Sequence, residues 1–577
     1  MSRPALPLML LFGALLAACS TPAAQAPAEP GPTVTVLAPL PTPDPRLPTP
    51  PPRITPMPIS PPAPLPAGWW DSAVCYEVFV RSFYDSDGDG IGDLRGLIQK
   101  LDYINDGDPA SRSDLGATCI WLMPIAEAAS YHGYDTLDYY RVDPEYGTNE
   151  DFKALVREAE ARGIKVVIDL VLNHTSSQHP WFQEALRDPT SSYRDWYLWS
   201  ASDPGFRGPF NNQVWHRSPV ADEYYYGLFW DGMPDLNYRN PAVTEEARRI
   251  SSFWIEEMGV AGFRLDAIKH LIEYRSVQED TAETHNWLRE YRTWLDVTHP
   301  GSYTIGEIFN ATPENLAPYY SDQLGYYFAF NIGRGIALAA NFGDARRYLA
   351  EVNASMGLPY QRWAPFLTNH DQNRIMTSLG DDMARARLAA IALLTLPGMP
   401  YIYYGEEIGM VGVKPDEDLR TPMQWTGEEG AGFTTGLPWR QPQRDYPEKN
   451  VAAQDSKPGS LLNTYRALIH LHVQTPALAM GDYLPLVADD TGVAAFLRLA
   501  GDDVALVLIN FGQTPVAASL SLAQSPLPAG AYRLTPLFND PGSAIAPLVV
   551  GPGGTIAPQA PLGELPAQSG FIVRVSP

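Results

Sequence analysis

The chain has 577 residues, enough for one large domain and a smaller one, because single hydrophobic cores seldom grow beyond ~250–300 residues. An apolar content of 45%, with 11% aromatic residues, is typical of a globular protein with a full core. The net charge of −25 argues against nucleic acid or an anionic membrane surface as partner and favours a neutral ligand.

The first 18 residues have the pattern of a signal peptide. Arg3 supplies a positive charge, and residues 6–18 are apolar but too few for a normal transmembrane helix. The segment ends in Leu-Ala-Ala-Cys, which resembles the bacterial lipobox, whose cysteine, here Cys19, becomes lipidated. An ordinary cleaved signal peptide is the alternative. We therefore expect an extracytoplasmic monomer, attached to the bacterial cell envelope by a lipid anchor at Cys19 only.

Residues 19–67 are dense in Pro, Ala and Thr and show no apolar periodicity. Such a segment cannot bury a core, so the sequence predicts an extended tether that holds the globular part away from the membrane. Two further cysteines, Cys75 and Cys119, fall in predicted strands. Buried free thiols are the favoured interpretation, although an oxidising compartment would also permit a disulfide.

From residue 68 to 475 predicted strands alternate with helices, as in a parallel α/β sheet. The helix expected over 149–162 has clear start and stop signals, because Thr148 precedes it, acidic residues lie in its first turn and Gly163 follows it. Eight strands in this arrangement predict a (β/α)8 TIM barrel. The predicted strands are 73–80, 117–123, 165–172, 259–266, 303–308, 325–331, 363–369 and 399–404.

Two segments depart from this alternation. Residues 174–236 form an inserted domain after the third strand, which divides the barrel into 68–173 and 237–475. Residues 476–577 change to short strands with alternating apolar positions, at 493–499, 504–510, 517–522 and 571–575. This pattern predicts a C-terminal antiparallel β-sandwich domain.

Polar residues gather where the barrel strands end. Arg264 and Asp266 are two residues apart, so in a strand they share one face, and the guanidinium can keep the carboxylate ionised. An isolated Arg–Asp pair would be structural. Here, however, similar residues end three other strands, and barrel active sites lie at this edge. These residues are Asp169, Asn173 and His174, then Glu307, then Asn369, His370 and Asp371.

Four segments together identify a family. The sequence D-L-V-L-N-H at 169–174, G-F-R-L-D-A-I-K-H at 262–270, Glu307, and F-L-T-N-H-D at 366–371 resemble the four principal motifs of the α-amylase superfamily of glycoside hydrolases. Residues 116–124, 233–237 and 398–409 resemble its accessory motifs. The resemblance spans about residues 70–475 and implies a retaining glycosidase in a (β/α)8 barrel.

The resemblance also implies roles for single residues. Asp266 would be the nucleophile, Glu307 the general acid/base, and Asp371 the carboxylate that supports the oxocarbenium-like transition state. Arg264 is expected to keep Asp266 charged, while neighbouring carboxylates raise the pKa of Glu307. The substrate-binding residues would be Tyr134, Asp169, His174, Arg264, Lys269, His270, His370 and Arg420.

Two positions bear on substrate preference. Relatives that release single glucose units carry an acidic residue where this chain has Tyr131, and it pairs with the arginine that Arg420 resembles. The incomplete pair and Ala267 after the nucleophile favour endo-acting hydrolysis of α-1,4 bonds in starch, glycogen and maltooligosaccharides. An α-glucanotransferase, a neopullulanase or α-glucosidase, and a catalytically silent glucan-binding lipoprotein are the alternatives.

One acidic loop has the spacing of a structural Ca²⁺ site. Oxygen ligands recur at alternate positions, with glycines between them, as the loop of such a site requires. The candidate ligands are Asp85, Asp87, Asp89, Ile91 and Asp93. A solvated Asp/Gly-rich turn is the alternative. Asn173 is a candidate for a second calcium site, whose other ligands the sequence does not reveal.

Overall fold

The computed structural model describes residues 68–309, 313–321, 326–328, 330–356, 362–542 and 544–577. The predicted signal, Cys19 and the tether lie outside this part. No helix in the described part of the chain is long and apolar enough to cross a membrane.

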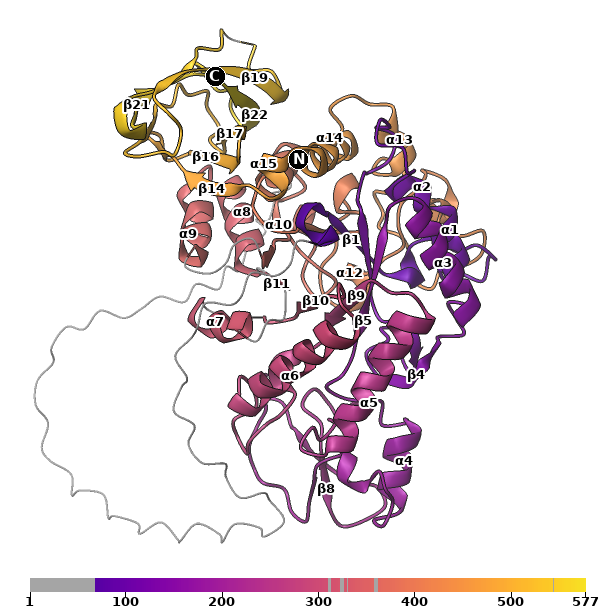
Figure 1. Ribbon diagram of the computed structural model, residues 1–577. Coiled ribbons are helices and arrows are strands. Elements are labelled where there is room, and N and C mark those ends of the chain that lie inside the picture. Colours follow the sequence, from indigo (N-terminus) through magenta and orange to yellow (C-terminus); the bar gives the residue numbers. More distant parts are fainter. Residues whose placement is uncertain (1–67, 310–312, 322–325, 329, 357–361, 543) are drawn as a thin grey trace, which may run out of the picture. The chain divides into compact units, whose positions relative to one another are not determined.

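Eight parallel strands form the predicted barrel, in the order β12-β11-β10-β9-β5-β2-β1-β13. Figure 1 labels β1, β5, β9, β10 and β11 of this sheet. The sheet closes on itself where Phe366 pairs with Tyr401, whose N–H donates to Pro365 O at 2.9 Å. The (β/α)8 fold is therefore confirmed. The strands are β1 (Cys75–Val78), β2 (Cys119–Leu122), β5 (Lys165–Leu170), β9 (Gly262–Leu265), β10 (Tyr303–Gly306), β11 (Tyr326–Phe328), β12 (Trp363–Ala364) and β13 (Tyr401–Tyr403).

The strands are shorter than the apolar runs that predicted them. The run at 363–369 pairs as a strand only over Trp363–Ala364, and Asn331 lies in a helix and not in the sixth strand. Beyond β12, Phe366 makes a single bridge to Tyr401 and Leu367 is buried outside the strand, so composition alone overextends the strand. The polar residues that follow are thereby free to turn into the mouth.

The helices follow the strands as expected. Helix α3 begins with a capping box between Thr148 and Asp151, and Gly163, with φ +74°, lies just past its end. The helices are α1 (Leu94–Gln99), α2 (Leu101–Ile104), α3 (Asn149–Ala161), α4 (Pro180–Arg187), α5 (Pro241–Ser252), α6 (Ala282–Thr298), α7 (Pro313–Ser321), α8 (Phe330–Phe342), α9 (Arg346–Ser355), α10 (Ile375–Ser378), α11 (Met383–Leu394), α12 (Asp416–Leu419), α13 (Val451–Asp455), α14 (Leu461–Gln474) and α15 (Pro476–Ala479).

The two strand cysteines form a disulfide, which corrects the preference for free thiols. Cys75 and Cys119 are direct register partners in β1 and β2, with Cα atoms 4.3 Å apart. Both side chains are completely buried. The sequence could not show this pairing, because it depends on the register of two strands that lie 44 residues apart.

The insertion after β5 contains helix α4 and a three-stranded antiparallel sheet in the order β6-β8-β7. Its strands are β6 (Trp199–Ser200), β7 (Trp215–Arg217) and β8 (Tyr224–Tyr226). Trp215 and Tyr226 form a small core with Val214 and Leu228, whereas Trp230 is 49% exposed. Trp215 and Tyr226 are thus core residues of the insertion. A separate hairpin, β3 (Ala126–Ala128) and β4 (Thr136–Val142), precedes the insertion.

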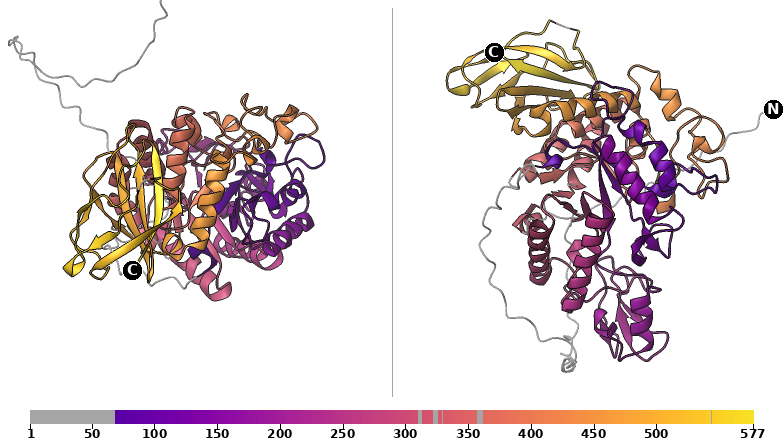
Figure 2. Two further views of the ribbon diagram at one scale, coloured as in Figure 1. Left: turned by 90° about the horizontal axis from the view of Figure 1, so that it is seen from above. Right: turned by 45° about the vertical axis from the view of Figure 1, so that its right-hand side comes forward.

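The C-terminal domain, yellow in Figure 2, has a six-stranded antiparallel sheet and a three-stranded one. Its central strand β17 is buried on both faces: Leu506 and Leu508 face the domain's own core, while Val507 and Ile509 join the large core of the barrel. The strands are β14 (Asp482–Pro485), β15 (Val487–Ala488), β16 (Val493–Ala500), β17 (Asp503–Asn510), β18 (Leu520–Leu522), β19 (Gly530–Phe538), β20 (Leu548–Val550), β21 (Ile556–Gln559) and β22 (Ser569–Ser576).

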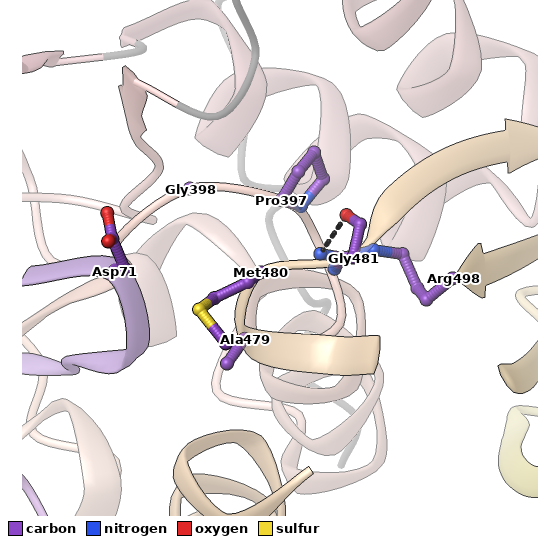
Figure 3. Close-up of a pocket in the computed structure, with 7 residues that line it drawn as sticks. All are labelled: Asp71, Pro397, Gly398, Ala479, Met480, Gly481 and Arg498. Carbon is purple, nitrogen blue, oxygen red and sulfur yellow. Dashed lines mark hydrogen bonds between the residues drawn. The ribbon is translucent and has the colours of Figure 1, made fainter. Parts of the chain in front are cut away.

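A buried arginine ties this domain to the barrel. Arg498 in β16 donates to Thr395 O at 2.7 Å and to Gly481 O at 2.9 Å, the contact drawn in Figure 3. It lines a cavity of about 160 Å³ together with Asp71 and Pro397. None of the sequence-predicted site residues lies in this cavity, which therefore belongs to the domain junction.

Candidate active site

One buried guanidinium organises the strand ends. Arg264 in β9 lies with its Nη1 2.8 Å from Asp169 Oδ1 and 2.6 Å from Asp266 Oδ1, and its Nη2 2.9 Å from Glu307 Oε2. The sheet register explains the convergence, because Asp169 in β5 is the direct partner of Arg264, and Glu307 follows the end of β10, the other neighbour of β9. Three carboxyl groups therefore share this one guanidinium.

The pKa values of Asp266 and Glu307 are both raised, whereas the sequence predicted an ionised Asp266 and a raised pKa for Glu307. Burial raises the pKa of Asp266, and Arg264 opposes this rise. Burial also raises the pKa of Glu307, opposed by Arg264 and assisted by Asp266 and Asp371. The rise predicted for Glu307 agrees in direction, with burial as its largest cause and the neighbouring carboxylates adding to it. Arg264 lowers the pKa of Asp266, as predicted, but does not offset burial, and its two terminal nitrogens are divided between Asp266 and Glu307.

The residue after Asp266 links the same two groups. Ala267 has φ +49°, in the left-handed region that residues other than glycine seldom adopt, and its N–H donates to Glu307 Oε2 at 3.0 Å. This strained turn ends β9 and aims a backbone donor at the predicted acid/base. The turn therefore couples the positions of the predicted nucleophile and the predicted acid.

Asp371 lies beside two cations. Its Oδ1 accepts from Arg420 Nη2 at 3.0 Å, and its Oδ2 lies 3.2 Å from His370 Nε2. Partial burial would by itself raise the pKa of Asp371, but His370 and Arg420 hold it well below its ordinary value. Burial would by itself lower the pKa of His370, yet Asp371 and Glu77 raise it to about 9. At neutral pH, Asp371 is thus a carboxylate with a 42% exposed side chain, and His370 is a cation.

Tyr134 and the histidines occupy defined places around this pair. The Tyr134 ring stacks on His370, with centroids 5.7 Å apart, and its hydroxyl lies 2.7 Å from His370 Nε2 and 3.0 Å from Asp169 Oδ2. His174 Nε2 lies 3.0 Å from Tyr134 O. Burial lowers the pKa of His174 to about 4, so this ring is neutral.

Lys269 and His270 belong to the turn after Asp266 and reach the segment that follows Glu307. Lys269 Nζ lies 3.3 Å from Phe309 O and 2.8 Å from Glu279 Oε2. His270 Nδ1 lies 2.8 Å from Gln278 O, while its buried Nε2 has no hydrogen-bond partner among the residues that the structure describes. Phe309 stacks on the 49% exposed Phe210 of the insertion, with centroids 5.7 Å apart. The insertion therefore contacts the segment after Glu307 through aromatic rings.

Arg420 has carboxylate partners even though position 131 is a tyrosine and not an acidic residue. Besides Asp371, its guanidinium donates to His370 O at 3.1 Å and lies 3.4 Å from Asp416 Oδ2. The Tyr131 ring centre is 6.0 Å from the Arg420 guanidinium carbon, and Tyr131 stacks on Trp439. The structure thus places Arg420 as a support for Asp371, with its second carboxylate supplied from helix α12.

Comparison with known proteins decides the family. Residues 77–481 match the family model "Alpha amylase, catalytic domain". The chain belongs to the α-amylase family. It is 39% identical to alpha-amylase 3 of Dictyoglomus thermophilum over 452 residues, which cover 77% of this chain and 86% of that protein. It is 36% identical to a trehalose synthase/amylase of Mycobacterium tuberculosis over 524 residues, covering 80% and 85%.

A solved structure agrees. The crystal structure of an α-amylase from H. orenii is similar with a TM-score of 0.76 at 40% identity, covering 88% of this chain and all of that one. The chain is therefore an enzyme of the glycoside hydrolase type. The relatives differ among themselves in activity, so the family does not by itself identify the reaction product.

The acidic loop of this α-amylase family member brings three of its five candidate ligands together. Carboxylate oxygens of Asp85, Asp87 and Asp89 all lie within 4.8 Å of one another, a donor set that suits a hard cation. Asp93 is not in this group. It caps helix α1 by accepting from Gly96 N at 2.8 Å and also binds Ser86. Ile91 donates its N–H to Asp89 Oδ1 at 2.8 Å.

Asn173 also has acidic neighbours, from segments far away in the sequence. Its Nδ2 donates to Asp235 Oδ2 at 3.1 Å, while its buried Oδ1 accepts no hydrogen bond from the described residues. Burial raises the pKa of Asp235 to about 7 and that of Glu273 well above its ordinary value, and each group affects the other. In the described part of the chain, buried Glu273 Oε1 likewise accepts no hydrogen bond. Two unpaired oxygens beside two carboxyl groups fit a bound cation.

Sequence reasoning missed several of these residues. Glu77 lies within the apolar run of β1 and contacts His370, and its only sequence signal was a charged residue inside a buried strand. Asp416 and Glu273 lie outside the recognised motifs. Phe309 follows Glu307 by two residues, but a lone phenylalanine after a strand indicates a core position as readily as a site.

Proposed function

We propose that the protein is an endo-acting, retaining hydrolase of α-1,4-glucosidic bonds in starch, glycogen and maltooligosaccharides. Within the family, the observation that carries the endo-acting assignment is the pairing of Arg420. Its guanidinium is engaged by Asp371, His370 O and Asp416, and the neighbouring loop offers Tyr131 in place of a carboxylate. Arg420 is therefore not used to close the cleft with an acidic residue from that loop. The 39% identity to an α-amylase supports the same assignment.

In a retaining mechanism, Asp266 and Glu307 each have a defined role in both steps. Asp266 attacks the anomeric carbon as the glycosidic C–O bond breaks, and Glu307 donates its proton to the departing oxygen. Water then attacks the glycosyl–Asp266 ester, Glu307 takes the proton from that water, and Asp266 leaves as a carboxylate. The raised pKa of Glu307 suits the first of these steps, since the acid must carry a proton when the bond breaks.

Asp371 and Tyr134 would bind the sugar ring that forms the intermediate. Asp371 is ionised and partly exposed, as a carboxylate that accepts hydrogen bonds from sugar hydroxyls and faces developing positive charge must be. The Tyr134 ring offers an apolar face beside it. Asp169 acts through Arg264 and Tyr134 and does not itself need to touch the substrate.

The test is the product pattern from soluble starch and from a maltooligosaccharide with a blocked end, with Glu307→Gln as the inactive control. Rapid loss of iodine staining, mixed oligosaccharides and cleavage of the blocked substrate are expected. Glucose as the only early product would replace the endo-acting assignment by an α-glucosidase, and products longer than the substrate would indicate a glucanotransferase. Activity in neither protein would favour a glucan-binding lipoprotein.

Calcium binding is a further part of the proposal. Asp85, Asp87 and Asp89 would hold a structural Ca²⁺, which would neutralise the loop between β1 and α1. Asn173, Asp235 and Glu273 would hold a second cation between the insertion and the barrel. When bound, such ions supply rigidity and not catalysis. Equilibrium dialysis of the wild type and of Asp85→Asn and Glu273→Gln variants tests the two sites separately, because each variant should lose one ion.

We also propose an extracytoplasmic location with a lipid anchor at Cys19. The disulfide between Cys75 and Cys119 supports an oxidising compartment, since such bonds are rare in the reducing cytosol. Metabolic labelling with a fatty acid tests the anchor: wild type should be labelled and Cys19→Ala should not. An unlabelled wild type that is found free in the medium would favour a simple cleaved signal peptide.

A further inference from the structure

A carboxylate inside the barrel has no role in the chemistry described so far. Glu77 in β1 is only 2% exposed, and its neighbour in the strand, Tyr76, points to the opposite side, where its hydroxyl donates to Glu407. Glu77 Oε1 lies 2.5 Å from Nδ1 of His370, which follows β12. Burying a carboxylate is costly unless it is paired, so this contact has to be balanced by charge on the imidazole.

His370 stands between two carboxylates. Its Nδ1 faces Glu77, and its Nε2 faces Asp371 Oδ2 at 3.2 Å and the Tyr134 hydroxyl at 2.7 Å. An imidazolium has a hydrogen-bond donor at each of these nitrogens, whereas a neutral ring has one donor and one lone pair. In the neutral form, one lone pair would face a carboxylate or depend on the Tyr134 hydroxyl. The positions of Glu77 and Asp371 therefore both favour the doubly protonated ring.

We propose that Glu77 is a positioning residue for the reaction: it orients the His370 ring and keeps it cationic, so that His370 holds Asp371 and Tyr134 in place at the sugar site. The proposal rests on the function proposed above, because it assigns Asp371 and Tyr134 to that site. Glu77 acts only through His370. Its removal should therefore change the pH range over which the enzyme works, in addition to any change in rate.

The charged and titratable groups around His370 determine the sign of the effect. Glu77 from β1, Asp371 from its own segment and the Tyr134 hydroxyl face the ring nitrogens directly, and Arg420 donates to the His370 carbonyl. Asp169 and Asp266 act at longer range. The positive charge of Arg420 opposes protonation of the ring, and the carboxylates favour it. Replacing Glu77 with a neutral amide removes one of the two nearest carboxylates, so the ring should lose its proton at lower pH.

The experiment compares kcat/KM against pH for the wild type and Glu77→Gln, with a 4-nitrophenyl maltooligosaccharide as substrate. The alkaline limb of the Glu77→Gln profile should move down by about 1–2 pH units, the size of shift that a close charge partner produces. Glu77→Asp keeps the charge and should leave the limb near its wild-type position, even if the rate falls. A limb that moves equally in both variants would overturn the role of charge.

A matched control is available on the other side of the same strand. Glu407 is completely buried and accepts from the Tyr76 and Tyr103 hydroxyls at 2.7 Å, so Glu407→Gln makes the same substitution in a similar setting. Its alkaline limb should stay in place. A rate loss in Glu77→Gln that is uniform across pH, as a purely structural defect would cause, would overturn the proposal.

A readout that needs no turnover separates this proposal from the proposed function. The ¹⁵N signals of the His370 ring, assigned by their loss in His370→Gln, should show both nitrogens protonated at pH 8 in the wild type. They should titrate at lower pH in Glu77→Gln. A neutral His370 at pH 8 in the wild type would overturn the proposal whether or not the variants fold. Absence of hydrolysis in the wild type would instead overturn the proposed function, and the ¹⁵N titration would still decide the role of Glu77.

Discussion

The molecule contains two acidic clusters that satisfy their carboxylates in different ways. At the strand ends, Asp169, Asp266 and Glu307 are buried and share one guanidinium, Arg264. In the loop after β1, Asp85 accepts backbone N–H groups of Gly88 and Gly90 at 2.7 and 2.8 Å, while Asp87 and Asp89 are exposed. Three buried carboxyl groups of the first cluster thus share a side-chain cation, whereas in the second cluster backbone amides serve the one buried carboxylate, Asp85, and solvent serves the two exposed ones.

The pKa directions follow this difference. Burial raises the pKa values of Asp169, to about 7, and of Asp266 and Glu307, although Arg264 opposes each rise. Burial would also raise the pKa of Asp85, but the Thr434 hydroxyl and the backbone amides of its loop bring it below its ordinary value. Carboxyl groups thus have raised pKa values in the first cluster, which suits proton transfer, and Asp85 has a lowered pKa in the second, which suits the cation binding that we propose.

The largest effect should come from the predicted nucleophile. Asp266→Asn should lower the rate of starch hydrolysis by a factor on the order of 10⁴ or more, because no other group can form the covalent intermediate. Circular dichroism should show the fold intact, since Arg264 keeps Asp169 and Glu307 as partners. Asp418→Asn, in an ion pair with Arg440 away from the strand ends, is the matched control. Near-normal turnover in Asp266→Asn would contradict the assignment.

Arg264 tests whether the buried cluster depends on one cation. Arg264→Met leaves three buried carboxylates without it and should lower the free energy of unfolding by about 3–5 kcal/mol. Urea denaturation at pH 7 measures this change. Arg440→Met removes an ion pair between side chains that are 40% and 37% exposed, and should cost at most about 1 kcal/mol. Equal losses in both variants would mean that burial does not distinguish the two pairs.

The charge on His370 should appear in the pH dependence of stability. Its pKa is raised to about 9 in the folded protein, so its contribution is complete below the unfolded value near ~6.5 and is lost as pH rises through about 9. The loss should be on the order of 3 kcal/mol. Unfolding measured from pH 6 to 10 checks it, and His370→Gln should flatten this part of the curve. An equal slope in that variant would assign the loss to other groups.

Added metal should stabilise the fold through the carboxylates of the loop after β1 and not through the buried carboxyl groups around Arg264. If Ca²⁺ binds there, saturating it at about 100 times Kd should stabilise the fold by about 2.7 kcal/mol, and a chelator should remove this gain. Asp85→Asn should abolish the loop's share of the calcium effect.

Asp93→Asn should have the smallest effect, and it separates the role of a helix cap from that of the converging carboxylates in the same loop. Because Asp93 caps helix α1 and lies outside the converging carboxylates, its substitution should cost at most about 1 kcal/mol and preserve the response to calcium. Thermal unfolding with and without calcium checks both variants. Loss of the calcium response in Asp93→Asn would return this residue to the ligand set.

Sequence reasoning predicted the parts of the site that depend on the order of residues within a single strand. Arg264 and Asp266 share a face because they alternate in one strand, and parallel strands bring their carboxyl ends to one edge of the barrel. The motif residues at strands three, four, five and seven were therefore predictable as a group. The ends of the strands were not, because apolar residues in the barrel mouth are buried with or without a hydrogen-bonded ladder.

What the sequence determined by itself was the alternation of strands and helices, the family motifs and the identity of the charged residues at the strand ends. Only the tertiary structure decided which charges meet. The pairings of Cys75 with Cys119, Glu77 with His370, and Asp371 with Arg420 depend on strand register and on loops that return to the barrel. Long-range register and burial determine the energy of each such pair, and neither is contained in the local pattern of residues.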